Sequence, residues 1–112
     1  MTQEALFSYG TLQLPHVQRA TYGRLLDGAP DALPCYRLEP LEIMDESVAR
    51  LSGLAVHQIA RHSGHAADCV SGTVFLLSRA ELDATDRYEV AQYERRLVRL
   101  QSGRDAWAYL AP

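Results

Sequence analysis

The stretch 70-VSGTVFLL-77 followed by 78-SRAELDATDRYE-89 decides the fold class. The second half of the first segment is continuously apolar, which predicts a strand buried on both faces. Ser78 and Glu81 match a capping box, so a helix is predicted to begin there and to run to about Glu89. Gly72 within the strand indicates a bulge or the close approach of another backbone.

Further strands are predicted on both sides of this unit. The apolar and alternating patterns place them at residues 5–9, 36–44, 54–59, 93–100 and 105–110. Ser102 and Gly103 fit a hairpin turn between the last two strands. Pro15 suits the first turn of a short helix. Residues 22–26 are predicted to form a strand or an extended stretch, whereas Gly28, Pro30, Asp31 and Pro34 indicate a loop.

About six strands, one main helix and a short second helix predict an α+β fold. The sheet is expected to be a small mixed sheet that curls, or closes as a β-barrel, around its own core. The 112 residues allow one domain, which we place over residues 1–112.

Composition and charge exclude several classes of partner. The net charge is -3, with no basic patch, so nucleic acid and anionic membranes are poor candidates. No apolar run approaches the length of a membrane span, and no signal-peptide pattern precedes the first strand, which favours a cytoplasmic location. Cys35 and Cys69 fit no metal or redox spacing and are expected to be small buried residues.

The main helix carries carboxylates where apolar residues are expected. On a helical wheel, Leu82, Thr85, Asp86 and Glu89 fall within one arc. Burial and the negative end of the helix dipole would raise the pKa of Glu89 and make it a general acid and base near neutral pH. The alternative is an ion pair between Glu89 and an arginine, for which Arg95, Arg96 and Arg37 are the candidates.

A second candidate feature is the segment 7-FSYGTL-12, where the first strand ends. A strand that ends at Gly10 and continues toward a helix start leaves backbone N–H groups unpaired. Such groups can bind an oxygen anion, and Gly10 allows a ligand to come close to the backbone.

Four motifs together resemble the gamma-glutamylcyclotransferase-like superfamily, in particular its short bacterial members. They are Tyr9-Gly10-Thr11-Leu12, Gly72-Thr73-Val74-Phe75, Asp86-Arg87-Tyr88-Glu89 with Tyr93, and Ala106-Trp107-Ala108-Tyr109. The resemblance covers residues 6–109. Val90 departs from the family, in which many members have Gly, and we expect it to narrow the space near Glu89.

The resemblance implies an enzyme that cyclises a γ-glutamyl compound to 5-oxoproline and releases a free amine. It implies that Glu89 is the catalytic acid and base, and that Tyr9, Gly10, Thr11 and Leu12 hold the glutamyl group. Tyr93 is then expected to bond Glu89 or the substrate, and Tyr109 to line the cavity. The expected partner is a small-molecule substrate, with no cofactor and no metal.

Alternatives to this enzyme remain open at the level of sequence. The same fold can serve as a non-catalytic binding or interaction module, or act on a γ-glutamyl amine or another amide. A zinc site is disfavoured because its possible ligands have no regular spacing; these are His57, His62, His65, Asp68 and Cys69.

Overall fold

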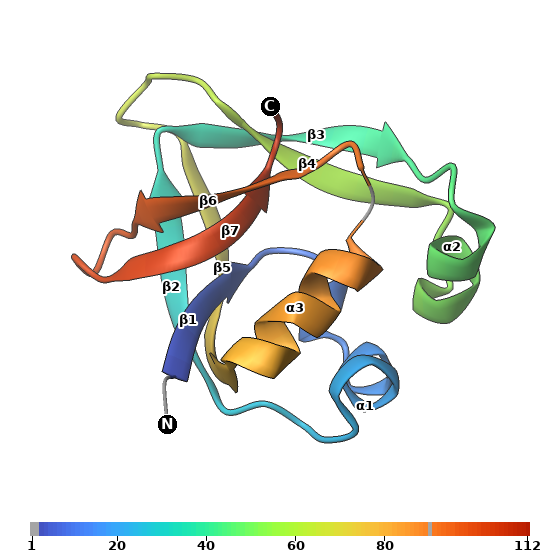
Figure 1. Cartoon of the computed structure of the whole chain (residues 1–112). Coiled ribbons are helices and arrows are strands. Elements are labelled where there is room, and N and C mark those ends of the chain that lie inside the picture. Colours follow the sequence, from blue (N-terminus) through green and yellow to red (C-terminus); the bar gives the residue numbers. More distant parts are fainter. Residues whose placement is uncertain (1–2, 90) are drawn as a thin grey trace.

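A five-stranded mixed sheet forms the centre of the molecule (Figure 1). The computed structural model describes residues 3–89 and 91–112. Its strands are β1 Gln3–Ser8, β2 Gly28–Pro34, β3 Tyr36–Glu42, β4 Val56–His62, β5 Cys69–Ser78, β6 Glu94–Arg99 and β7 Asp105–Leu110. Its helices are α1 Pro15–Tyr22, α2 Glu46–Ser52 and α3 Arg79–Tyr88, with a 3-10 turn, η1, at Thr11–Gln13.

The strand order of the main sheet is β2-β5-β1-β7-β6. The central strand β1 runs antiparallel to β5 and parallel to β7, while β3 and β4 form a separate antiparallel ribbon. The prediction of an α+β fold with a curled mixed sheet is therefore confirmed. The described strands do not close into a barrel, because β2 and β6 remain as edges of the main sheet.

Successive residues of β1 face two different hydrophobic cores. Leu6 packs in a cluster with Val17 of α1 and Leu82 of α3, whereas Phe7 packs with Leu33 of β2 and Ala60 of β4. Because neighbouring strand residues point to opposite faces, β1 separates the helical layer from the β3–β4 ribbon. Burial of β1 on both faces explains why this strand is almost entirely apolar after Glu4.

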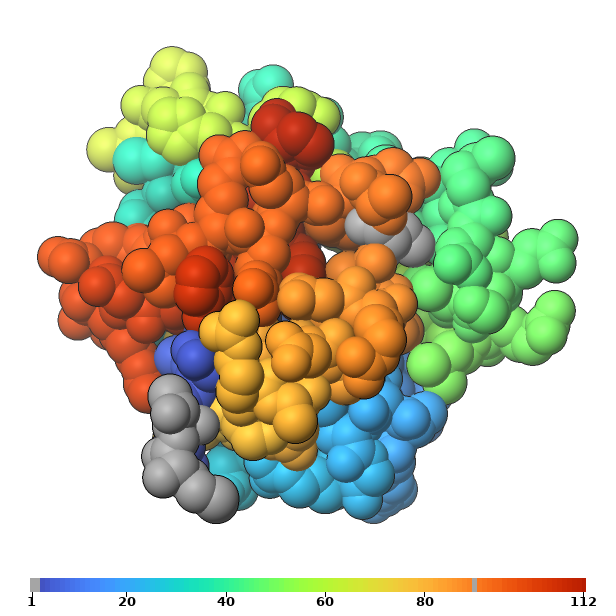
Figure 2. Space-filling model, in the orientation of Figure 1, coloured from blue at the N-terminus to red at the C-terminus, as the bar shows by residue number. Residues whose placement is uncertain are grey.

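The strand and helix that decide the fold class form as predicted. The Ser78 hydroxyl accepts from the Glu81 N–H at 3.1 Å, and the Ser78 N–H donates to the Glu81 carboxylate at 2.8 Å. This capping box starts α3, and Leu82 is fully buried beneath it. Figure 2 shows α3 at the surface, between α1 and the β6–β7 hairpin.

Gly72 allows β5 to pack closely on the end of β1. A Cβ atom at position 72 would overlap the Ser8 carbonyl oxygen and the Phe7 ring. The predicted close approach of another backbone is confirmed, and it brings β5 against the point where β1 turns into η1.

The prediction of a loop around residues 28–34 is wrong, because this segment is strand β2. Pro30 and Pro34 lack the N–H that a central strand needs, but β2 lies at the sheet edge and pairs only with β5. Asp31 accepts a hydrogen bond from the Ser102 hydroxyl at 2.6 Å, which ties β2 to the β6–β7 turn.

The helical content is also larger than predicted. Tyr22 ends α1 and Gly23 terminates it at a φ of 73°, so residues 22–26 form no strand. The helix α2 is an element that the sequence patterns above do not predict, although Asp45 caps its start and Gly53, at a φ of 79°, ends it. This short helix shifts the next strand, β4, to Val56–His62.

The two cysteines are free, and their predicted burial is wrong for Cys69. Cys69 is exposed because it begins β5 at the outer end of the sheet, beside Gln101. Cys35 is half-buried in the turn between β2 and β3, with a left-handed φ of 69°.

Candidate active site

The turn that follows β1 forms one wall of a cavity. The Gln18 amide group donates to the Leu12 carbonyl at 2.8 Å, and Thr73 donates to the side chain of Gln13 at 2.9 Å. These contacts hold η1 against α1 and β5. Within the described chain, the N–H groups of Thr11 and Leu12 make no hydrogen bond, as expected for the first residues of a helical turn.

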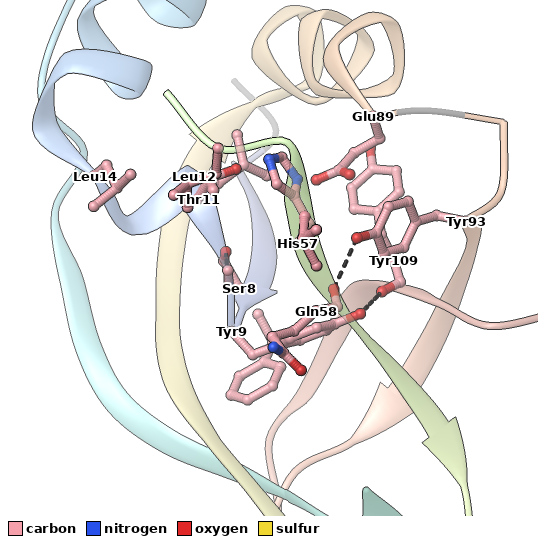
Figure 3. A pocket seen from close by; sticks show the side chains of 14 residues that line it. Ser8, Tyr9, Thr11, Leu12, Leu14, His57, Gln58, Glu89, Tyr93 and Tyr109 are labelled. Carbon is pink, nitrogen blue, oxygen red and sulfur yellow. Dashed lines mark hydrogen bonds between the residues drawn. The ribbon is translucent and has the colours of Figure 1, made fainter. Parts of the chain in front are cut away.

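Glu89 forms the opposite wall, at the position that ends α3. Its N–H still bonds the Thr85 carbonyl at 2.9 Å, but its ψ of 138° is extended, so the helix stops there. The carboxyl group points into the cavity toward the side of Thr11 and His57 (Figure 3). The residue is partly exposed as a whole, but burial of its carboxyl end raises the pKa of Glu89 to about 8.

The arginines proposed as alternative partners of Glu89 are all engaged elsewhere. Arg95 pairs with Asp86, Arg96 with Glu94 and Arg37 with Glu39. Among residues 3–89 and 91–112, Glu89 makes no ion pair and no side-chain hydrogen bond. Its carboxyl group therefore faces the cavity without a partner from these residues.

Asp86 does not share the buried environment of Glu89, contrary to the prediction. Its side chain is 40% exposed and lies 3.4 Å from the Arg95 guanidinium. The Tyr109 hydroxyl donates to the Asp86 carboxylate at 2.5 Å. The helical wheel placed Asp86 on the inner face, but the buried positions of α3 are Leu82, Thr85 and Tyr88.

Two of the predicted site tyrosines have their hydroxyls bonded to the protein backbone. The Tyr9 hydroxyl donates to the Tyr109 carbonyl at 2.5 Å and accepts from the Ala60 N–H at 2.9 Å, which joins the main sheet to β4. The Tyr93 hydroxyl donates to the Gln58 carbonyl at 2.8 Å rather than to Glu89 (Figure 3). Burial raises the pKa of both phenols well above the usual range, so both stay neutral.

The residues expected at the site lie around one cavity of about 300 Å³. They are Tyr9, Gly10, Thr11, Leu12, Glu89, Tyr93 and Tyr109. The structure adds Leu14 from the loop before α1, and Leu54, Val56, His57 and Gln58 from the segment after α2. Sequence reasoning missed this last group because it missed α2, although the Asp45 and Gly53 caps were the available signal. Val90, expected to narrow the space near Glu89, lies outside the described residues.

His57 is a titratable side chain of the cavity lining that sequence reasoning did not assign to the site. Its Nε2 lies 2.9 Å from the Ser52 hydroxyl, and burial lowers the pKa of His57. The other candidate metal ligands, His62, His65, Asp68 and Cys69, are absent from the lining. In the described part of the chain, no three His, Cys, Asp or Glu side chains come together as a metal site.

No helix within residues 3–89 and 91–112 has the length and apolarity needed to cross a bilayer. Together, the fold and cavity define a small α+β protein with a ligand-sized pocket, walled by the turn after its first strand and by a buried carboxyl group. The chain belongs to the family described as gamma-glutamyl cyclotransferase, AIG2-like, whose model matches residues 6–112.

Solved structures support the fold assignment. A solution structure of a protein from Arabidopsis thaliana is 23% identical, with a TM-score of 0.71 over 99% of this chain and 63% of that one. A structure titled gamma-glutamyl cyclotransferase is 16% identical, with a TM-score of 0.73 over 99% of this chain and 68% of that one. A protein specific to uropathogenic E. coli is 22% identical, with a TM-score of 0.66 over 100% of this chain and 81% of that one.

The present chain thus spans less than two thirds of the Arabidopsis chain that it matches. No curated protein matches its sequence.

Proposed function

We propose that this protein cyclises a γ-glutamyl compound to 5-oxoproline and releases the amine. The observation that carries the proposal is the carboxyl group of Glu89, which has no partner among the described residues and faces the turn Gly10–Leu12 across one cavity. A carboxyl group whose pKa is raised to about 8 is suited to accept and return a proton near neutral pH. The family assignment supports cyclotransferase chemistry in general.

The reaction requires little equipment because it is intramolecular. The Glu89 carboxylate takes a proton from the α-ammonium group of the substrate, and the amine nitrogen then attacks the γ-carbonyl carbon. The oxyanion of the tetrahedral intermediate collapses, and the bond to the leaving nitrogen breaks. That nitrogen receives the proton from Glu89, which returns the carboxylate to its starting state. The ring nitrogen still holds a second proton, which passes through the same carboxylate to the released amine, so the products are 5-oxoproline and a protonated amine.

In this proposal the turn after β1, which forms the cavity wall opposite Glu89, supplies the groups that bind the substrate. We assign the binding of the substrate α-carboxylate, or of the developing oxyanion, to the N–H groups of Thr11 and Leu12, which have no partner among the described residues. Gly10 leaves this backbone accessible, since nothing lies within 4 Å of the position where a Cβ would stand. Tyr9, Tyr93 and Tyr109 enclose the glutamyl group, and their bonded hydroxyls keep the walls in place.

The test measures 5-oxoproline release from a panel of γ-glutamyl amino acids, peptides and amines. We expect turnover by the wild type without added metal or nucleotide. Glu89→Gln keeps the size of the side chain but removes the proton acceptor, so the rate should fall by about 10²- to 10⁴-fold.

Asp83→Asn is the matched control, because it neutralises an exposed carboxylate on the same helix that neither lines the cavity nor bonds a residue that does. Its rate should stay within about threefold of the wild type, as for a surface change. Absence of turnover on the whole panel would argue for a binding module, and equal rates for both variants would show that Glu89 is not the proton acceptor.

A further inference from the structure

Tyr88 lies directly before Glu89 and outside the cavity lining. It is the last residue of α3, and only 7% of its surface is exposed. Its ring packs in the cluster between the sheet and the helices. This cluster includes Leu12 of the turn Gly10–Leu12, which we call the substrate turn. Tyr88 is therefore a buried residue behind the wall that carries the candidate proton acceptor.

The Tyr88 hydroxyl connects two elements that are far apart in sequence. It lies 2.7 Å from the Thr11 hydroxyl, across 77 positions of the chain. Within the described residues, this is the one hydrogen bond between η1 and α3. The bond therefore links the turn that carries the free N–H groups to the residue that precedes Glu89.

A second polar contact reaches the cavity lining from α2. The Ser52 hydroxyl lies 2.9 Å from His57 Nε2, and both residues are buried. Thr11 and His57 line the cavity, whereas Tyr88 and Ser52 do not. Tyr88 and Ser52 thus each hold one lining residue from outside the cavity.

We propose that the Tyr88 hydroxyl is a positioning group, which sets the spacing between the substrate turn and the Glu89 carboxyl group by holding Thr11. This inference rests on the proposed function. Cyclisation needs the amine, the γ-carbonyl carbon and the proton acceptor in line, and displacements near 1 Å can cost about 10²-fold in rate. The Thr11–Tyr88 hydrogen bond is the direct link between these two walls in the described residues.

The first test compares Tyr88→Phe, Thr11→Val and the double variant in the cyclotransferase assay. Tyr88→Phe keeps the buried ring and removes only the bridging oxygen. We expect kcat to fall about tenfold for each single variant and KM to change less. The double variant should be no slower than the slower single one, because both changes break the same link.

Tyr22→Phe is the matched control. The Tyr22 hydroxyl bonds Thr85 on the same helix, but Tyr22 does not line the cavity or contact η1 through that hydroxyl. Removal of its hydroxyl should lower the thermal midpoint about as much as Tyr88→Phe does and leave kcat within about twofold. Equal kcat values for Tyr88→Phe and Tyr22→Phe would overturn the proposal.

The second test does not depend on activity. A looser η1 admits water to the cavity, so the NMR titration midpoint of the Glu89 carboxyl group should fall in Tyr88→Phe and stay unchanged in Tyr22→Phe. An unchanged midpoint in Tyr88→Phe would contradict the positioning role. If the wild type turns over no substrate, the proposed function fails, and this titration still decides whether Tyr88 positions Glu89.

Discussion

Asp86 and Glu89 stand one helical turn apart, and they occupy opposite environments. Asp86 lies on the outer side of α3, bonded by the Tyr109 hydroxyl and close to Arg95. Glu89 lies at the inner end, with its carboxyl group buried in the cavity and unpaired within the described residues. The first carboxylate is bonded as part of the scaffold, whereas the second faces the cavity and is the group that we propose exchanges a proton.

The difference arises from where the buried face of α3 is centred. The buried residues of this helix are Leu82, Thr85 and Tyr88, so the face is centred on Thr85. Glu89 keeps a helical φ of -69°, so its side chain leaves the backbone on this face, four residues after Thr85. Asp86 lies at the edge of the same face, on the side of Leu82 away from Tyr88, and reaches Tyr109 and Arg95.

The largest effect that separates the two carboxylates should be the pH dependence of turnover. Glu89 must be ionised to accept a proton, and its pKa is raised to about 8. Below that value kcat/KM should fall by about tenfold per pH unit, or about fiftyfold between pH 8 and pH 6. Asp86→Asn should show the same profile in steady-state assays. A profile that bends near pH 4.5 would assign the essential carboxylate to an unburied group.

The next largest effect that should separate the two carboxylates is the contribution of Glu89 to the pH dependence of the free energy of unfolding. The folded-state pKa of Glu89 is raised from 4.5 to about 8, so the folded protein holds a proton that the unfolded chain releases. Stability should therefore fall as pH rises from about 4.5 to 8 and then level off.

Glu89→Gln removes this penalty and should stabilise the protein at pH 9 by about 2 kcal/mol, allowing for partial solvent access. Urea denaturation at pH 4 should show no such gain. A Glu89→Gln protein that is less stable at pH 9 would contradict the unpaired state of the carboxyl group.

The smallest effects should come from the contacts of Asp86, the outer carboxylate, and should appear in the free energy of unfolding. Tyr109→Phe removes the hydroxyl that donates to Asp86 and should cost about 1 kcal/mol in the free energy of unfolding. The partly exposed pair between Asp86 and Arg95 should contribute about 0.5 kcal/mol, part of which 1 M salt should screen. A loss above about 3 kcal/mol for Asp86→Asn would show that Asp86 is a buried partner after all.

The sequence predicted those parts of the fold in which local patterns agree with tertiary structure. The capping box at Ser78, the apolar half of β5 and the hairpin turn near Gly103 carry their own local signals, and each formed as expected. The strand β2 could not be predicted locally, because Pro30 and Pro34 are tolerated only at a sheet edge. An edge position is set by the whole topology and not by the segment itself.

The candidate site also has one part that local sequence patterns predict and another part that depends on how separate elements pack. Motif resemblance and helical spacing are enough to predict that Glu89 and the turn Tyr9–Leu12 belong to one site. The other wall, with His57 and Gln58, depends on α2 and on how the β3–β4 ribbon crosses the main sheet (Figure 1). Such packing of separate elements leaves no short pattern in the sequence.

The central place of β1 has a consequence for synthesis of the chain. β1 is made before its partners β5 and β7, and its Leu6 pairs with Trp107 far along the sequence. A ribosome must therefore deliver β7 before the central strand has both neighbours. Contacts between such distant segments slow folding, typically to milliseconds or seconds. We therefore expect the cavity to assemble late, after β7 has left the ribosome, and the nascent chain to expose an unpaired apolar strand until then.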